Sequence, residues 1–157
     1  MLARHAASAR RVAWIDLHTG LGPSGVGERI WAGGNDAPAI ARARRWWGDQ
    51  VTSIYDGSSS SALLTGLMWE SIHDAAPQAE YTGIAMEYGT QPITEVLDAL
   101  RGDHWLAKHP EAPPELAASI KARLLKAFYT DTDAWKGQII SQARQAQFQA
   151  VDGLGRA

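Results

Sequence analysis

Three short apolar segments, each followed by a segment with helical spacing, constrain the fold of this chain more than any other feature. Apolar runs of this length, bounded by glycine and turn residues, are typical of buried strands. They occupy residues 12–17, 51–55 and 81–88. Apolar side chains recur at helical spacing in residues 37–47, 62–73 and 93–106. This alternation predicts an α/β fold with a partial, mainly parallel sheet and helices packed on it.

The rest of the chain is predicted to consist of loops and further helices. Residues 19–35 contain six Gly and one Pro, which favours a long loop. Prolines break the chain between 110 and 114, and helical spacing then recurs over 115–129 and from about 131 to 151. Three strands are few for a parallel sheet, which needs cover on both faces. We therefore expect one partial α/β domain over 1–157, in which 110–157 is a helical C-terminal extension.

Composition excludes several classes of function. Fifteen Lys and Arg against 17 Asp and Glu give a formal charge of -2, so no basic excess exists to bind a nucleic-acid backbone. The chain has no Cys, which excludes disulfides and thiolate chemistry. No apolar run reaches the roughly 18 residues of a membrane helix, so no membrane partner is expected. Arg10 and Arg11 stand where a secretory signal needs an apolar core, so a cytoplasmic location is expected.

His18 is the first candidate for chemistry. It follows the predicted strand 12–17 and begins a glycine-rich segment. Open α/β sheets place their ligands at such strand ends, where an imidazole can reach a metal ion or a substrate. The alternative is an ordinary polar residue at the end of a strand.

Glu87 is the second candidate, because it lies inside an otherwise apolar strand. Burying an unpaired carboxylate is costly, so such a residue has either a partner or a catalytic role. The structural alternative is an ion pair with an arginine such as Arg29 or Arg101.

Residues 20–25 also fit the dinucleotide-binding pattern G-x-G-x-x-G. Two features count against that interpretation. A helix should open within the motif, and residues 25–34 do not have a helical pattern. Pro23 also lacks the backbone N–H group that would donate a hydrogen bond to a phosphate. A nucleotide-binding α/β module is therefore the weakest of the three functional hypotheses.

Two motifs of the chain are informative together. The first is Ile-Asp-Leu-His-Thr-Gly-Leu-Gly-Pro-Ser-Gly at 15–25, and the second is Glu-Tyr-Gly-Thr at 87–90, followed by a helix that ends near His-Trp-Leu. Together they resemble the motifs of a bacterial family related to the zinc carboxypeptidases and to the aspartoacylase/succinylglutamate desuccinylase group. The resemblance covers residues 11–109, and it implies a zinc-carboxypeptidase-like fold with a zinc cofactor. His18 would be a metal ligand, and Glu87 would be the general base that activates the zinc-bound water. The implied substrate is an amide, either a C-terminal peptide bond or an N-acyl amino acid.

The family takes its other two zinc ligands from a His-x-x-Glu motif, and this chain has none. His5 is followed by Ala-Ala-Ser and His18 by Thr-Gly-Leu. A catalytic zinc ion takes three protein ligands and a water molecule. We therefore expect an incomplete hydrolase, inactive as an isolated chain, that self-associates or binds a complementing chain. The alternative is a non-catalytic remnant that acts through protein–protein contacts, so the sequence leaves open whether the chain is an enzyme.

Overall fold

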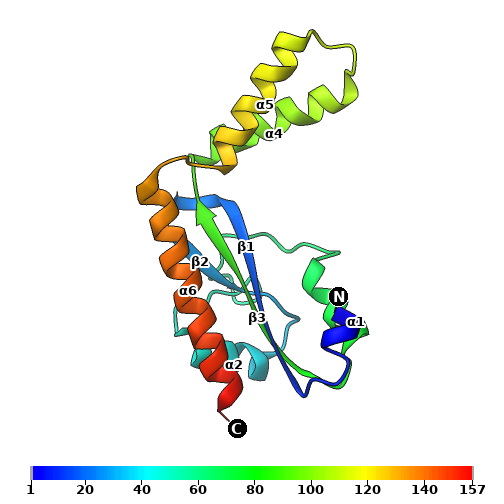
Figure 1. The fold of residues 1–157 in the computed structure, drawn as a ribbon, viewed down its shortest axis with the longest axis vertical. Helices are drawn as coiled ribbons and strands as arrows, with labels where there is room; N and C mark the ends of the chain where they lie inside the picture. The colour runs from blue at the N-terminus through cyan, green and yellow to red at the C-terminus, as the bar shows by residue number, and fades with distance from the viewer. Residues whose placement is uncertain (1, 157) are drawn as a thin grey trace. The chain divides into compact units, whose positions relative to one another are not determined.

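The computed structural model describes residues 2–156, which form an α/β structure (Figure 1). The second half of the chain, after β3, is helical. In chain order the elements are α1 (Leu2–His5), β1 (Arg11–Ser24), β2 (Gly27–Trp31), α2 (Ala37–Trp47), the 3-10 helix η1 (Met68–Glu70), α3 (Ser71–Ala75), β3 (Glu80–Gly89), α4 (Ile93–Lys108), α5 (Pro114–Phe128) and α6 (Asp133–Gly155).

The sheet has the strand order β1-β3-β2 and is mixed, so the predicted mainly parallel sheet is wrong. β1 and β3 run parallel, since Glu80 N donates to Arg10 O at their beginnings. β2 runs antiparallel to β3, since Ala32 N donates to Gly83 O and Gly89 N donates to Val26 O. The predicted loop 19–35 instead contains the end of β1 and all of β2. Only two residues join β1 to β2. A connection between parallel strands needs a dozen residues or more, so β2 runs in the opposite direction to β1.

Most of the other predicted elements are confirmed. Residues 37–47 form α2, whose Ala39 N donates to the Asp36 side chain (3.2 Å) and whose C-cap is Gly48. The predicted strand 81–88 is β3, and α4, α5 and α6 lie where helical spacing placed them.

Two predictions between residues 51 and 73 are wrong. Residues 51–55 contribute only a parallel bridge between Thr52 and Ile30. The predicted helix 62–73 is replaced by an irregular segment followed by η1 and α3. Gly66 has a φ of 73°, outside the helical region, and Leu63 is 71% exposed. A helix in a protein is stabilised mainly by packing its apolar face against other elements. Apolar residues at helical spacing therefore do not form a helix in this segment, where that packing is missing.

The described residues divide into two compact units. The first comprises 2–17, 28–86 and 142–156. Its core contains the fully buried side chains of Trp47, Ile84 and Met86. The indole of Trp47 donates to Ala146 O (3.0 Å), which ties α2 to the C-terminal part of α6. The guanidinium of buried Arg29 donates to Trp47 O and to the Gln145 side chain (3.2 Å).

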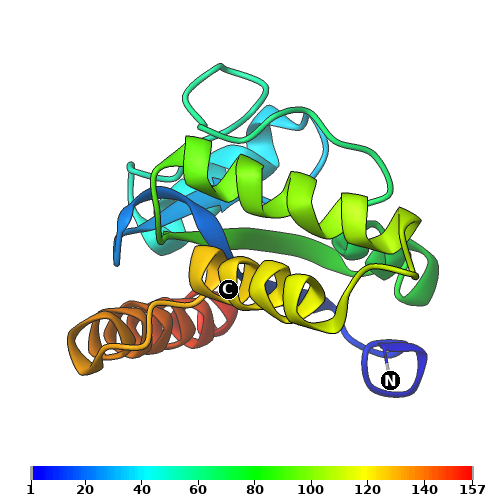
Figure 2. The same cartoon turned by 90° about the horizontal axis from the view of Figure 1, so that it is seen from above.

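The second unit comprises 18–27 and 87–141. In it α4 and α5 pack side by side as a helical hairpin, as Figures 1 and 2 show. The indole of Trp135, at the start of α6, donates to Gly89 O (3.0 Å). Tyr88 is fully buried, and its hydroxyl donates to Ile139 O (3.3 Å). These bonds fix the N-terminal part of α6 to the end of β3.

Candidate functional site

The chain crosses over the end of β3 at Gly89, and this crossing positions the candidate site. Gly25 N donates to Gly89 O (3.0 Å), and Gly89 N donates to Val26 O (3.2 Å). A Cβ atom at Gly89 would lie 2.2 Å from both Gly22 O and Pro23 O. Only glycine permits this close approach of two backbone segments.

Within residues 20–25, which pass over the end of β3, glycines take backbone conformations that other residues rarely adopt. The φ angles are 95° at Gly22 and 74° at Gly25. Residues 20–25 thus bend the end of β1 and turn the chain into β2. Dinucleotide-binding motifs hold phosphate at the N-terminus of a helix, whereas this segment leads into a strand, so the nucleotide interpretation gains no support from the fold.

His18, in the middle of β1, and Glu87, near the end of β3, come together although they are 69 residues apart in the sequence. The prediction that His18 follows the strand is wrong, because β1 continues to Ser24. The distance from His18 Nδ1 to Glu87 Oε2 is 3.9 Å. The Glu87 side chain is 13% exposed, whereas the His18 side chain is 50% exposed. Leu21 N donates to the other carboxylate oxygen, Glu87 Oε1 (3.0 Å). One oxygen of a largely buried carboxylate is thus held by a backbone N–H, and the other faces an accessible imidazole.

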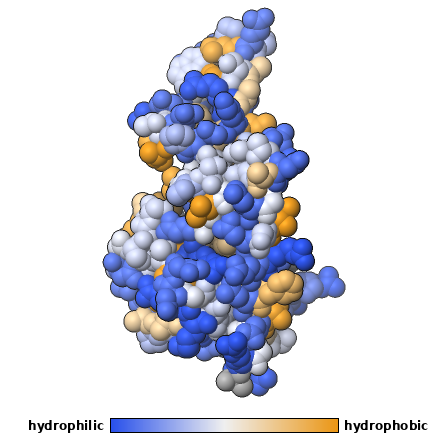
Figure 3. All heavy atoms as spheres, turned by 90° about the vertical axis from the view of Figure 1, so that its left-hand side faces the viewer, coloured by the Kyte–Doolittle hydropathy of each residue, from blue (hydrophilic) through white to orange (hydrophobic). Residues whose placement is uncertain are grey.

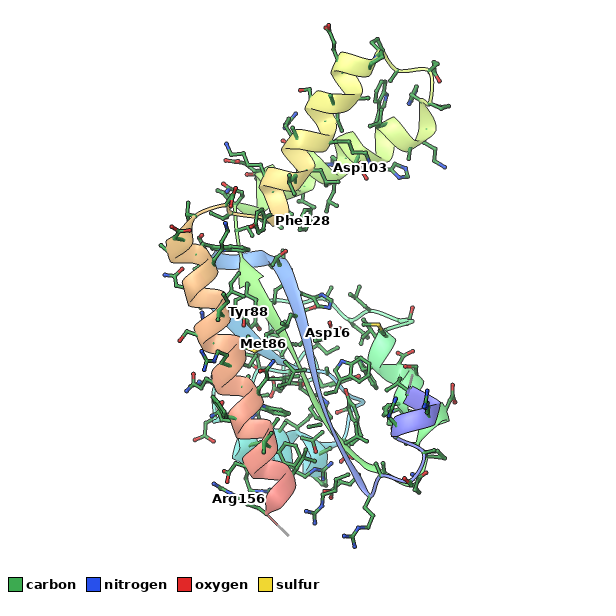
Figure 4. All side chains as sticks on the ribbon, in the orientation of Figure 1. Asp16, Met86, Tyr88, Asp103, Phe128 and Arg156 are labelled. Atoms are coloured by element: carbon green, nitrogen blue, oxygen red, sulfur yellow. The ribbon has the colours of Figure 1, made fainter. Side chains whose placement is uncertain are left out.

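Two further residues that sequence reasoning assigned no role hold this arrangement in place. The hydroxyl of buried Thr90 lies 2.5 Å from Ala127 O and 3.3 Å from Gly20 O. Phe128, labelled in Figure 4 at the end of α5, places its ring within 3.0 Å of where a Gly20 Cβ atom would stand. Thr90 belongs to the Glu-Tyr-Gly-Thr motif, but nothing in the sequence pairs Phe128 with Gly20.

A hollow of about 450 Å³ lies beside these residues, lined by 20–24 and 90–93. Its volume falls within the range of small-molecule sites. Gly20, Leu21 and Thr90 contribute both to the hollow and to the contacts around Glu87. A small substrate could therefore approach the candidate site through this hollow.

The arginines proposed as structural partners of Glu87 have contacts of their own. Arg29 donates to Trp47 O and Gln145. Arg101, on α4, pairs with Asp98 (3.3 Å) on the same helix. This exposed pair is a surface interaction that contributes little to stability.

The residues at this site do not fit a catalytic zinc ion by themselves. His18 supplies one imidazole and Glu87 one carboxylate, while such an ion takes three protein ligands. Across residues 2–156, no group of three or more His, Asp or Glu side chains lies close enough to hold a metal ion.

One family model, described as a protein of unknown function (DUF2817), matches residues 1–142. The chain belongs to this family. The DUF2817 match extends beyond the region of the carboxypeptidase-like resemblance, through α5 and into α6. No curated protein and no solved structure matches the chain. Across residues 2–156, no helix of this DUF2817 member is long and apolar enough to cross a membrane.

Proposed function

We propose that this chain carries the general-base part of an amide-hydrolysing site of the carboxypeptidase-like kind. The observation that carries the proposal is the Glu87 carboxylate, held by Leu21 N and facing His18 (3.9 Å). In this proposal Glu87 takes a proton from the water that attacks the amide carbonyl, and then protonates the leaving nitrogen. A fixed, largely buried carboxylate suits this role because its orientation is set before the substrate arrives.

His18 is proposed as a metal ligand, and the set of ligands is incomplete within this chain. Its imidazole is half exposed, so it remains accessible to a metal ion and to residues from another polypeptide. The cofactor implied by the resemblance is zinc, and the implied substrate is a peptide or an N-acyl amino acid. The proposal therefore predicts weak metal binding and no turnover by the isolated chain.

Zinc titration followed by NMR tests this proposal directly. We expect weak binding that shifts the signals of His18 and Glu87, because one imidazole and one carboxylate cannot hold zinc tightly. His18→Ala should abolish these shifts, whereas His104→Ala, on α4, should leave them unchanged. Zinc shifts that persist in His18→Ala would refute the assignment of His18.

Activity assays on a panel of N-acyl amino acids and short peptides test the predicted incompleteness. We expect no hydrolysis above the buffer rate, with or without added zinc. Zinc-dependent turnover that disappears in Glu87→Gln would show that the isolated chain has a complete site, and the proposed incompleteness would then be wrong.

The second candidate function is a non-catalytic one, based on protein–protein contacts. The observation that favours it is an apolar hollow of about 440 Å³ on α4. Leu97, Leu100 and Trp105 contribute to its lining, and each of them is more than 40% exposed. Exposed apolar side chains that gather in this way are typical of interaction surfaces. We propose that a second copy of the chain covers this hollow.

Light scattering coupled to size-exclusion chromatography should detect this self-association as a mass that rises with protein concentration. Leu97→Glu should shift the chain toward the monomer, because a charge buried in an apolar interface is costly. Val151→Glu, at a 69% exposed position on α6, is the matched control and should leave the mass unchanged. Figure 3 shows one face of the molecule, where hydrophobic residues form small, separate groups. A monomer at all concentrations would contradict this second candidate function.

A further inference from the structure

Four arginines from three separate parts of the chain line one pocket in the first unit. Arg42 and Arg45 lie on α2, Arg11 begins β1, and Arg156 follows α6, where Figure 4 labels it. Trp46, Glu80 and Gly153 complete the lining of this cavity of about 290 Å³. We call this cavity the arginine pocket.

Two of the arginines are held by the protein itself. Arg42 Nε donates to Thr82 Oγ1 (2.7 Å), and its Nη2 donates to Tyr81 O (2.8 Å). Arg11 Nη1 donates to Leu154 O (3.2 Å) and Arg156 O (2.9 Å) at the end of α6. These bonds fix both guanidinium groups before any ligand arrives, which lowers the entropy cost of binding.

The carboxylates at the pocket do not balance its positive charge. Glu80 lies 3.6 Å from Arg11 Nε and 3.4 Å from Arg42 Nη1, so it is shared between two arginines. Arg156 pairs with Asp152. Arg45 is exposed, and its guanidinium has no ion pair or hydrogen bond with residues 2–156. Four guanidinium groups therefore face two carboxylates, in a chain whose formal charge is -2.

Trp46 forms a rigid wall of the arginine pocket. Its indole lies directly over Gly153, where a Cβ atom would come within 2.3 Å of the ring. It also makes an edge contact with buried Trp47, with ring centroids 5.4 Å apart. A flat aromatic surface beside guanidinium groups suits a small organic molecule that carries an anionic group.

We propose that the arginine pocket binds the phosphate group of a small phosphorylated molecule. Guanidinium groups match the geometry of phosphate oxygens and bind them through paired, charge-assisted hydrogen bonds. A phosphate dianion supplies the two negative charges that the pocket lacks. The cavity lies just below the usual range of volumes for small-molecule sites, so the ligand is a compact phosphomonoester rather than a large cofactor.

Titration of inorganic phosphate into the full chain tests this proposal, with sodium chloride keeping the ionic strength constant. We expect saturable binding by calorimetry and a rise in the unfolding temperature that chloride does not produce. The indole N–H signal of Trp46, assigned with Trp46→Phe, should shift along the same binding curve. Phosphate that stabilises the chain no more than chloride does would overturn the proposal.

Arginine variants identify the site. The double variant Arg45→Gln with Arg156→Gln should bind phosphate at least tenfold more weakly, because it removes both exposed guanidinium groups. Arg101→Gln, at an exposed arginine on α4, is the matched control and should bind as the unmodified chain does. Circular dichroism checks that the double variant remains folded. Equal phosphate affinity in the folded double variant and the unmodified chain would exclude the arginine pocket as the site.

Arg45→Lys separates geometry from charge. Lysine keeps the positive charge but lacks the planar fork of donors. We expect affinity between those of the unmodified chain and the double variant. Glu87→Gln should leave phosphate binding unchanged, so this proposal stands or fails independently of the proposed hydrolytic function.

Discussion

Replacing Gly89 by alanine is expected to destabilise the chain strongly, because the new methyl group has no space. It would lie 2.2 Å from the carbonyl oxygens of Gly22 and Pro23, which are backbone atoms that cannot rotate away. Overpacking of this kind costs about 1–3 kcal/mol, and more when the backbone has to move. The crossing also places Leu21 N at Glu87 Oε1, so the alanine variant should lose the geometry of the candidate site as well. Urea unfolding followed by tryptophan fluorescence measures the loss of stability.

Gly137→Ala is the matched control for this prediction. Gly137 lies in α6, and a Cβ atom there would meet nothing within 4 Å. Alanine is favoured over glycine inside a helix by about 0.5–1 kcal/mol, so the control should be neutral or slightly stabilising. An unchanged urea midpoint in Gly89→Ala would mean that the two backbone segments do not approach each other this closely.

Replacing Trp47 by alanine should have the larger effect on stability. The side chain is 0% exposed, and its indole donates to Ala146 O (3.0 Å). Truncating a buried tryptophan costs about 3–5 kcal/mol, since it removes apolar contacts and leaves a cavity. The carbonyl of Ala146 would also lose its hydrogen bond. Domains of this size are stable by only about 5–15 kcal/mol, so we expect a variant that unfolds at much lower temperature or urea concentration.

Trp105→Ala tests whether this effect comes from burial rather than from the loss of any tryptophan. Trp105 is 41% exposed on α4 and stacks on His109, with ring centroids 4.1 Å apart. Measured at a concentration where the chain is a monomer, its truncation should cost less than about 1 kcal/mol. Similar losses for Trp47→Ala and Trp105→Ala would contradict the core assigned to the first unit.

His18 and Glu87 could be chosen as candidate site residues from the sequence alone. The residues and backbone groups that surround them could not be predicted. His18 follows an apolar run and Glu87 interrupts one, and both are local signals. That the two meet depends on the pairing of β1 with β3, which the sequence did not specify. The contact of Leu21 N with Glu87 could not be predicted, because a backbone donor carries no residue-specific signal.

Residues 62–75 show how tertiary contacts override local patterns. Helical spacing predicted a helix over 62–73, but the helical part is limited to the short η1 and α3. In this segment Trp69 stacks on Tyr81, with ring centroids 6.1 Å apart, and His73 contacts the same ring (5.7 Å). Burial and the nearby Asp16 raise the pKa of Tyr81 well above its ordinary range. Contacts with the following strand, β3, thus accompany the helical turns of this segment.

The sequence by itself determined the elements whose signals are local. Asp36 and Gly48 delimit α2, the apolar run ending at Gly89 defines β3, and helical spacing places α4, α5 and α6. Only the tertiary structure decided that residues 18–24 extend β1 and that residues 27–31 form β2. Glycine-rich segments have little conformational preference of their own, so pairing partners distant in the sequence select their conformation. The same long-range pairing made the sheet mixed and brought the Leu21 N–H to the Glu87 carboxylate.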